Sequence, residues 1–251
     1  MAGRLIFLGT AGGRVVVYKQ LRASGGIWFE YNDTRMLIDP GPCSLRCITK
    51  SKHKLDPTKL DAIYVSHRHL DHSIGANAVI EAMTEGGFKP RGTLFITRDA
   101  LEDDPVILKY LQKYLKDIVL LEEGKTFKLK DIEFTTPVKH IHGVETYGFN
   151  LRIGKLTISY IADTKYFPEL PDYYNGDIMI INVVRYQPSN LLHLCIPEVK
   201  QILTRATPKK AIITHFGMTM LRARPWEVAA RLTEETGVDV VAANDGMMVE
   251  L

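Results

Sequence analysis

The sequence predicts an α/β protein in which a β-sandwich is flanked by helices. Short apolar runs rich in β-branched residues recur along the chain and are typical of strands. Helical patterns lie between only some of them, and this mixture fits a sandwich with helices better than a purely parallel, doubly wound sheet. No Pro/Ser-rich linker, low-complexity tract or repeat interrupts the 251 residues, so we expect a single domain over residues 1–251.

The elements follow from these runs in chain order. The predicted strands are residues 4–10, 25–31, 35–39, 61–66, 92–97, 132–138, 147–153, 155–163, 177–184, 210–215 and 239–245. The predicted helices are residues 72–87, 104–117, 197–208 and 225–237. The first helix has an apolar side and stops at a Gly pair, and the second begins with Asp104 placed to cap it and Pro105 in its first turn. The first half therefore carries hairpin-like strand pairs, and the second half mixes strands with helices.

Composition favours an ordinary globular protein, with 45% hydrophobic and 24% charged residues. No stretch is long and apolar enough to span a membrane, and the first residues, MAGRLIFLGTAGG, are too short an apolar run for a signal peptide. The three cysteines are an odd number without a disulfide framework, which suits a reducing compartment. We expect a cytoplasmic protein with no membrane partner.

One segment, YVSHRHLDHSIG at residues 64–75, places three histidines and an aspartate within six positions. Imidazole and carboxylate together suit zinc, manganese or iron, although a polar, histidine-rich loop is the alternative. Other predicted strands also run into metal-competent residues, namely Asp39, His140 or His142, Asp163 and His215. Because strand ends collected at one edge hold side chains rigidly, we expect these residues to form one site.

The number of donors predicts two metal ions. The histidine-rich segment together with His142, Asp163 and His215 supplies seven donors, too many for one tetrahedral zinc. Two ions about 3.5–4 Å apart would share them, and a carboxylate with its two oxygens is the natural bridge.

Five motifs carry a family resemblance: LIDPG, SHRHLDH, HGVETYGF, IADT and THF, in this order over most of the chain. The sequence resembles the metallo-β-lactamase fold superfamily, which implies a four-layer αββα sandwich. The resemblance also implies two divalent ions, zinc first, with manganese or iron as alternatives. By the same resemblance one ion would be held by His67, His69 and His142, the other by Asp71, His72 and His215, and Asp163 would bridge them.

Two residues keep alternative interpretations. His140 lies two residues before His142 and is the other candidate ligand, but the spacing of His142 to YGF matches the family. Asp39 precedes Pro-Gly, so it is either a turn residue or an acceptor that orients a ligand histidine.

Absent features narrow the branch of the family. The bridging position holds Asp163 rather than the cysteine of the classical β-lactamases, so antibiotic hydrolysis is not expected. Only 36 residues follow His215, too few for the helical substrate domain of glyoxalase II. Only 51 residues separate Asp163 from His215, which leaves no room for the inserted domain of the CPSF-type nucleases. The compact branch of RNase Z and the cyclic-phosphate and nucleotide phosphodiesterases remains.

Two further residues fit that branch. His193 comes just before a predicted helix, as does a histidine of the family that contacts the scissile phosphate. Arg185 follows the strand 177–184, where a guanidinium would pair with an anionic substrate; an ordinary surface arginine is the alternative. The glycine/proline-rich arm that grips tRNA in RNase Z is not visible, so RNA is only a weakly supported partner.

The resemblance therefore implies a dinuclear metal-dependent phosphodiesterase acting on a small-molecule or nucleotide phosphodiester. A metal-bridging hydroxide would be the nucleophile, positioned by Asp71, and His193 would protonate or stabilise the leaving oxygen. Hydrolysis of a lactone or thioester carbonyl is the alternative, because the ligands do not distinguish carbonyl from phosphorus. A non-catalytic metal- or RNA-binding module is less favoured, since all seven ligands are present.

Overall fold

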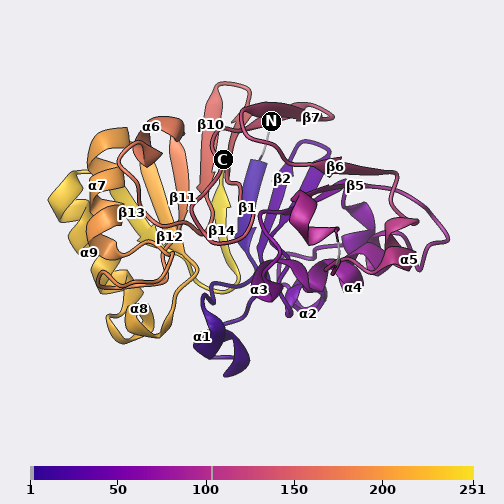
Figure 1. Ribbon diagram of the computed structural model, residues 1–251, viewed down its shortest axis with the longest axis horizontal. Coiled ribbons are helices and arrows are strands. Elements are labelled where there is room, and N and C mark those ends of the chain that lie inside the picture. The colour runs from indigo at the N-terminus through magenta and orange to yellow at the C-terminus, as the bar shows by residue number, and fades with distance from the viewer. Residues whose placement is uncertain (1–2, 103) are drawn as a thin grey trace. The chain divides into compact units, whose positions relative to one another are not determined.

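The computed structural model describes residues 3–102 and 104–251 and contains two compact units (Figure 1). The first unit comprises residues 3–10, 22–102, 104–121 and 244–251, and the second comprises residues 11–21 and 122–243. Each unit is built around its own seven-stranded sheet. That residues 1–251 behave as a single domain stays a prediction.

The first sheet has the strand order β14-β1-β2-β3-β4-β5-β6 and is antiparallel from β14 to β3 and parallel from β3 to β6. Its strands are β1 (Gly3–Phe7), β2 (Ile27–Tyr31), β3 (Thr34–Ile38), β4 (Ala62–Val65), β5 (Thr93–Ile96), β6 (Asp117–Leu120) and β14 (Met247–Glu250). The same unit holds α2 (Ser44–Thr49), α3 (Leu70–Ser73), α4 (Gly75–Met83), α5 (Lys109–Gln112) and the 3₁₀ turns η1 (Pro57–Lys59) and η2 (Arg98–Ala100).

Helix α4 covers this sheet because its apolar residues recur at helical spacing. Ala76, Val79, Ile80 and Met83 form one buried stripe, which joins Ile63 and other strand residues in a single apolar cluster. The alternate strand residues, such as Met36 and Tyr64, are buried as well, so both faces of the sheet are apolar. Each fully buried aliphatic side chain contributes about 1.5–3 kcal/mol relative to exposure.

The second sheet has the order β13-β12-β11-β10-β9-β8-β7, antiparallel from β7 to β10 and parallel from β10 to β13. Its strands are β7 (Lys125–Leu129), β8 (Ile132–Thr136), β9 (Phe149–Ile153), β10 (Leu156–Ile161), β11 (Ile178–Asn182), β12 (Lys210–Thr214) and β13 (Asp239–Ala242). The helices of this unit are α1 (Arg14–Tyr18), α6 (Leu170–Tyr173), α7 (Ile196–Ala206), α8 (Met218–Arg222) and α9 (Pro225–Thr236).

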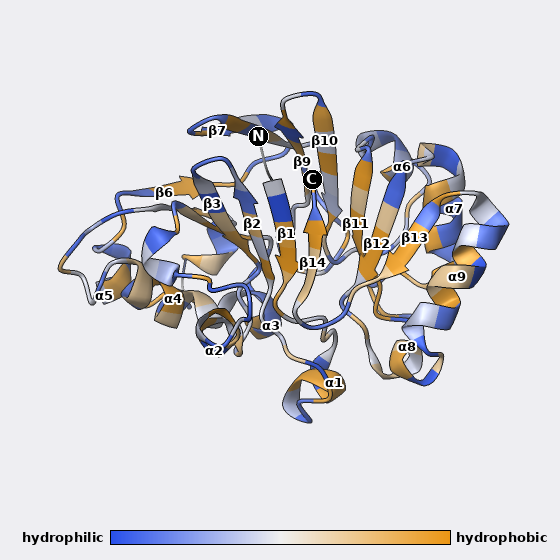
Figure 2. Cartoon of the chain, turned by 180° about the vertical axis from the view of Figure 1, so that it is seen from behind, coloured by the Kyte–Doolittle hydropathy of each residue, from blue (hydrophilic) through white to orange (hydrophobic). Residues whose placement is uncertain are grey.

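Helices α7 and α9 pack their apolar stripes into one cluster with the parallel strands of this sheet. Figure 2 shows the result as apolar strands beside helices that combine apolar and hydrophilic residues. Helix α7 starts where Glu198 accepts a hydrogen bond from the Cys195 N–H at 2.8 Å, and α9 ends at Gly237 in the left-handed conformation.

Each predicted strand coincides with an observed one, and the mixed sheets confirm an α/β fold over a purely parallel one. The predicted helices at 72–87, 197–208 and 225–237 are also present, the first divided into α3 and α4. Strands β6, β7 and β14 were not predicted, and both sheets carry antiparallel pairs.

The predicted helix over residues 104–117 is wrong. Only the single turn α5 forms, and β6 already begins at Asp117. The side chain of Asn77 donates a hydrogen bond to the Val106 carbonyl at 2.8 Å and accepts one from the Leu108 N–H at 2.9 Å. These bonds hold residues 106–108 in a non-helical conformation, with Ile107 buried, so tertiary contacts override local helix propensity.

None of the helices in residues 3–102 and 104–251 has both the length and the apolar character that a bilayer crossing requires. Cytoplasmic localisation stays a prediction.

Candidate metal centre

In the first unit, parallel pairing brings two strand ends together. Strands β3 and β4 pair with Ile38 opposite Tyr64, and the Asp39 N–H donates to the Tyr64 carbonyl at 2.8 Å. The residues that follow, Asp39 on one strand and His67 on the other, therefore lie at the same edge of the sheet.

Two glycines allow the helical part of the histidine-rich segment to reach this edge. A Cβ at Gly41 would lie 2.4 Å from the carbonyl oxygen of Asp71, and a Cβ at Gly75 would lie 2.0 Å from that of Gly41. Only glycine permits such backbone contact, and it places α3, with Asp71 and His72, against the Asp39 turn. Asp39 itself has a φ of 50°, an uncommon conformation for a residue other than glycine.

Asp39 orients two of the candidate ligands. Its buried carboxylate accepts hydrogen bonds from the Ser66 Oγ–H at 2.7 Å and from His72 Nδ1–H at 2.9 Å. Because the Ser66 proton points at the carboxylate, the Ser66 oxygen is left to accept from His67 Nδ1–H at 3.0 Å. In the neutral form of each ring the proton is therefore on Nδ1, and Nε2 is the nitrogen that can bind a metal ion.

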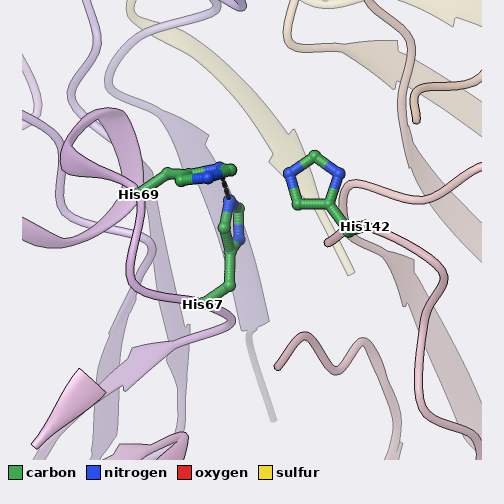
Figure 3. A group of neighbouring side chains, drawn as sticks. All are labelled: His67, His69 and His142. Atoms are coloured by element: carbon green, nitrogen blue, oxygen red, sulfur yellow. Dashed lines mark hydrogen bonds between the residues drawn. The ribbon is translucent and has the colours of Figure 1, made fainter. Parts of the chain in front are cut away.

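His67 and His69 present their ring nitrogens to each other (Figure 3). His67 Nε2 lies 3.1 Å from His69 Nδ1, with the ring planes at 81°. Two nitrogens on one tetrahedral zinc, each at 2.0–2.1 Å, are about 3.3 Å apart, so this pair fits a single ion. Asp71 is partly exposed on α3, with its Oδ2 at 3.9 Å from His72 Nε2.

In the second unit, the ends of three parallel strands bring candidate ligands together. The ends of β10, β11 and β12 lie side by side, and Asp163 and His215 follow the first and third of them. His215 has a φ of 61°, and a Cβ at Gly12 would lie 2.0 Å from its carbonyl oxygen. Glycine at position 12 thus allows the segment before α1 to hold His215 in this conformation.

Three histidines surround the buried carboxylate of Asp163. Its Oδ2 is 3.3 Å from His193 Nδ1 and 3.7 Å from His142 Nε2, and its Oδ1 is 3.4 Å from His215 Nδ1. The ligand atoms of His142, Asp163 and His193 all lie within 4.8 Å of one another. Nitrogen and oxygen donors at this spacing fit a divalent ion.

His142 (Figure 3) has its tautomer fixed by the loop that carries His193. His142 Nδ1–H donates to the carbonyl of Leu192 at 2.8 Å, which leaves Nε2 unprotonated toward Asp163.

His140 makes different contacts from His142. Its Nδ1–H donates to the main-chain carbonyl of Asp163 at 3.2 Å, and its Nε2 accepts from the Tyr174 hydroxyl at 2.6 Å. Complete burial lowers the pKa of His140 to about 4, so the ring is neutral. Both nitrogens have protein partners, and His142 is therefore the better candidate ligand.

The sequence of this fold matches a known family. Residues 34–216 match the family model described as the Beta-lactamase superfamily domain. The chain belongs to this superfamily. As a member of the beta-lactamase superfamily it is a metal-dependent hydrolase.

Individual members of the superfamily show the same likeness. An uncharacterized protein of Methanocaldococcus jannaschii is 30% identical over 261 residues, covering 100% of this chain and 96% of its own. A protein of Thermococcus sibiricus named Ribonuclease Z is 30% identical over 154 residues, covering 58% of this chain and 46% of its own. The crystal structure of the metallo-beta-lactamase fold protein YhfI from Bacillus subtilis superposes with a TM-score of 0.82 at 21% identity over the whole of both chains. This likeness confirms the predicted metallo-β-lactamase fold.

Asn182, the last residue of β11, belongs to the candidate site of this superfamily member but was missed in the sequence. Its Nδ2 donates to Asp163 Oδ1 at 2.9 Å and to the Tyr160 hydroxyl at 3.2 Å, and the side chain is buried. A carboxylate only accepts hydrogen bonds, so the amide orientation is fixed by chemistry. The available signal was one polar residue within the apolar run DIMIINVV, at the strand end.

Arg185 lies at the base of the loop that carries His193. Its N–H donates to the Leu194 carbonyl at 3.2 Å, and Arg185 forms a parallel bridge with Cys195 that closes this loop. The Nε of Arg185 is buried and has no hydrogen-bond partner among the described residues. The main-chain contacts therefore fix the backbone of Arg185 beside the loop that carries His193.

Proposed function

We propose that the chain is a dinuclear metal-dependent phosphodiesterase. One divalent ion, zinc before manganese or iron, is assigned to His67, His69 and His142, and the other to Asp71, His72 and His215. Asp163 would be a ligand shared by both ions. The observation that carries this proposal is the set of fixed tautomers, since His67, His72 and His142 each direct an unprotonated Nε2 away from their protein acceptors.

Divalent ions in such a site supply Lewis acidity, which lowers the pKa of water and offsets negative charge on a phosphoryl group. The residues of the chain do the rest. Asp71, partly exposed beside His72, positions the attacking water and takes its proton. His193 lies 3.3 Å from Asp163 with its side chain partly exposed, and it donates a proton to the leaving oxygen. Arg185 offers its guanidinium to the phosphate charge.

Two points favour phosphorus over carbonyl substrates. The chain is similar to proteins named Ribonuclease Z, which include that of Thermococcus sibiricus. It also combines a histidine and an arginine on one loop, and these donors suit the oxygens of a phosphodiester. We expect the substrate to be a small-molecule or nucleotide phosphodiester.

The test combines metal content with hydrolysis on the purified chain. We expect near two metals per chain by mass spectrometry, and chelator-sensitive release of nitrophenol from bis-p-nitrophenyl phosphate. His193→Ala should keep both metals and lower kcat by about 100-fold or more, the usual effect of losing a general acid. Two metals with turnover of lactones or thioesters but not of the phosphodiester would contradict the substrate class. Failure to hold any metal would contradict the site.

A further inference from the structure

A tight turn after α4 presents a phenylalanine to solvent. Glu85, Gly86 and Gly87 all have positive φ angles, and the turn is closed by hydrogen bonds from Gly87 N–H and Lys89 N–H to the Thr84 carbonyl at 3.1 and 3.0 Å. Phe88 follows this turn with 90% of its surface exposed. An aromatic ring held outward on an ordered turn is available for contact with a partner.

Two tyrosines connect this turn to the segment around α5. A Cβ at Gly87 would lie 2.6 Å from the ring of Tyr114, so the turn rests directly on that ring. Tyr114 in turn meets Tyr110 edge to face, with ring centroids 6.0 Å apart. Tyr110 is 50% exposed, so Phe88 and Tyr110 are exposed rings on either side of one packed tyrosine.

The same segments are basic. Residues 88–91 and 105–116 contain five basic residues and no acidic residue: Lys89, Arg91, Lys109, Lys113 and Lys116. Within residues 3–102 and 104–251, no carboxylate forms an ion pair with Lys109, Lys113 or Lys116, and all three are exposed. Lys89 is paired only with Glu85, at 2.8 Å on the surface, a contact worth little in water.

We propose that this surface, formed by Phe88, Lys89, Lys109, Tyr110 and Lys113 and called here the basic–aromatic patch, binds single-stranded nucleic acid. Exposed rings provide stacking platforms for unpaired bases, and unpaired lysines beside them neutralise the phosphates between those bases. The patch contains no candidate metal ligand and lies wholly in the first unit. The patch would therefore bind nucleic acid through residues that take no part in the proposed hydrolysis.

The deciding measurement is fluorescence anisotropy of a labelled twelve-residue oligouridylate, titrated with the full metal-loaded chain, with a gel after each titration to confirm that the probe is intact. We expect binding that weakens steeply with salt. The double variant Lys109→Glu/Lys113→Glu should weaken it by about tenfold or more and reduce the slope of log K against log salt by about 1.4, since each phosphate contact on a single strand contributes about 0.7. Phe88→Ala/Tyr110→Ala should weaken binding by about fivefold or more per stacked base.

Matched control variants test whether binding depends on this patch or only on net charge and on any exposed aromatic ring. Lys128→Glu/Lys155→Glu makes the same change in net charge in the second unit, at exposed positions, and Trp226→Ala removes a ring that is 57% exposed there. Both controls should bind the oligouridylate like the natural chain. All variants should keep their metal content and their hydrolysis of bis-p-nitrophenyl phosphate, so failure of the patch is distinguishable from failure of the proposed function.

Four results would overturn the inference. The first is no binding by the natural chain at low salt, and the second is equal weakening by the charge control. The third is binding of phosphatidylserine vesicles, but not oligouridylate, with the same dependence on the patch, which would assign the surface to a lipid membrane. The fourth is a change of oligomeric state in the patch variants, measured by sedimentation without oligonucleotide, because that would assign the surface to a second copy of the chain.

Discussion

Asp163 accepts hydrogen bonds from two residues and lies close to the ring nitrogens of two further histidines. Because these contacts come from separate segments of the chain, we expect its replacement to have large effects. Its main-chain carbonyl accepts from His140, its Oδ1 accepts from Asn182, and His142 and His193 lie within 3.7 Å of its Oδ2. A buried carboxylate is costly unless it serves as a ligand, an ion-pair partner or a hydrogen-bond acceptor. Variants of Asp163 and of its neighbours distinguish a metal ligand from a hydrogen-bond acceptor.

Replacing the carboxylate should remove the metals. For Asp163→Ala we expect metal content to fall from two ions to below one per chain and kcat to fall by at least about 100-fold, because both ions lose a shared ligand. Mass spectrometry and phosphodiester hydrolysis measure the two effects. Asp172→Ala, at an exposed carboxylate, is the control and should change neither quantity. Two metals and full activity in Asp163→Ala would show that Asp163 is not the bridge.

Asn182 should act through Asp163. For Asn182→Leu we expect metal affinity to fall by about 10- to 100-fold, the usual cost of losing a residue that orients a ligand. Competition with a chromogenic chelator measures this affinity. The matched control is Asn150→Leu on strand β9 of the same sheet, whose amide donates to the Tyr173 carbonyl at 2.7 Å and not to any candidate ligand. Equal metal affinity in the two variants would reduce Asn182 to a packing residue.

Loss of the Tyr174 hydroxyl should lower the stability of the fold without affecting metal binding. Tyr174→Phe leaves the buried Nε2 of His140 without its donor, so we expect a loss of about 1–3 kcal/mol in the free energy of unfolding. Urea denaturation measures it. Because His140 is assigned as a structural residue, the variant should still hold two ions. A loss of one ion at unchanged stability would instead make His140 a ligand.

At the scale of elements, the position of α3 and α4 depends on backbone contacts that tolerate no side chain. For Gly75→Ala, the added Cβ would lie 2.0 Å from the Gly41 carbonyl, so we expect a destabilisation of about 3 kcal/mol or more and weaker metal binding through His72. Gly237→Ala is the comparison, since its φ is 73° but nothing lies within 4 Å of the new Cβ, and it should cost about 1 kcal/mol. Thermal unfolding and metal titration compare them. Equal costs would show that α3 moves freely to accommodate the methyl group.

Some elements and candidate ligands could be predicted from the sequence, and others depend on contacts between distant residues. The ligand-bearing segments were predictable because each follows an apolar strand and carries metal-competent residue types, as with Asp39 and His215. The helix over 104–117 was not, because Asn77, about thirty positions away along the chain, decides the conformation of residues 106–108. Asn182 escaped for a similar reason: a polar residue within an apolar run has no periodic signature, and its partner, Asp163, becomes apparent only after folding.

At the scale of the whole molecule, bound metal should stabilise the folded chain, because the proposed ligands come from segments far apart along the sequence. An ion that binds only the folded chain stabilises it by about 2.7 kcal/mol when its concentration is 100 times its Kd. For a chain of this size each kcal/mol raises Tm by about 2–4 °C, so a saturating chelator should lower Tm by roughly 5–10 °C for one such ion and by more for two. Calorimetry with and without chelator measures the shift, and Asp163→Ala should show almost none of it. The same scan tests the predicted single domain: one transition that moves as a whole supports it, whereas two transitions, of which only one responds to chelator, would mean that the units unfold separately and that one of them alone holds the metal.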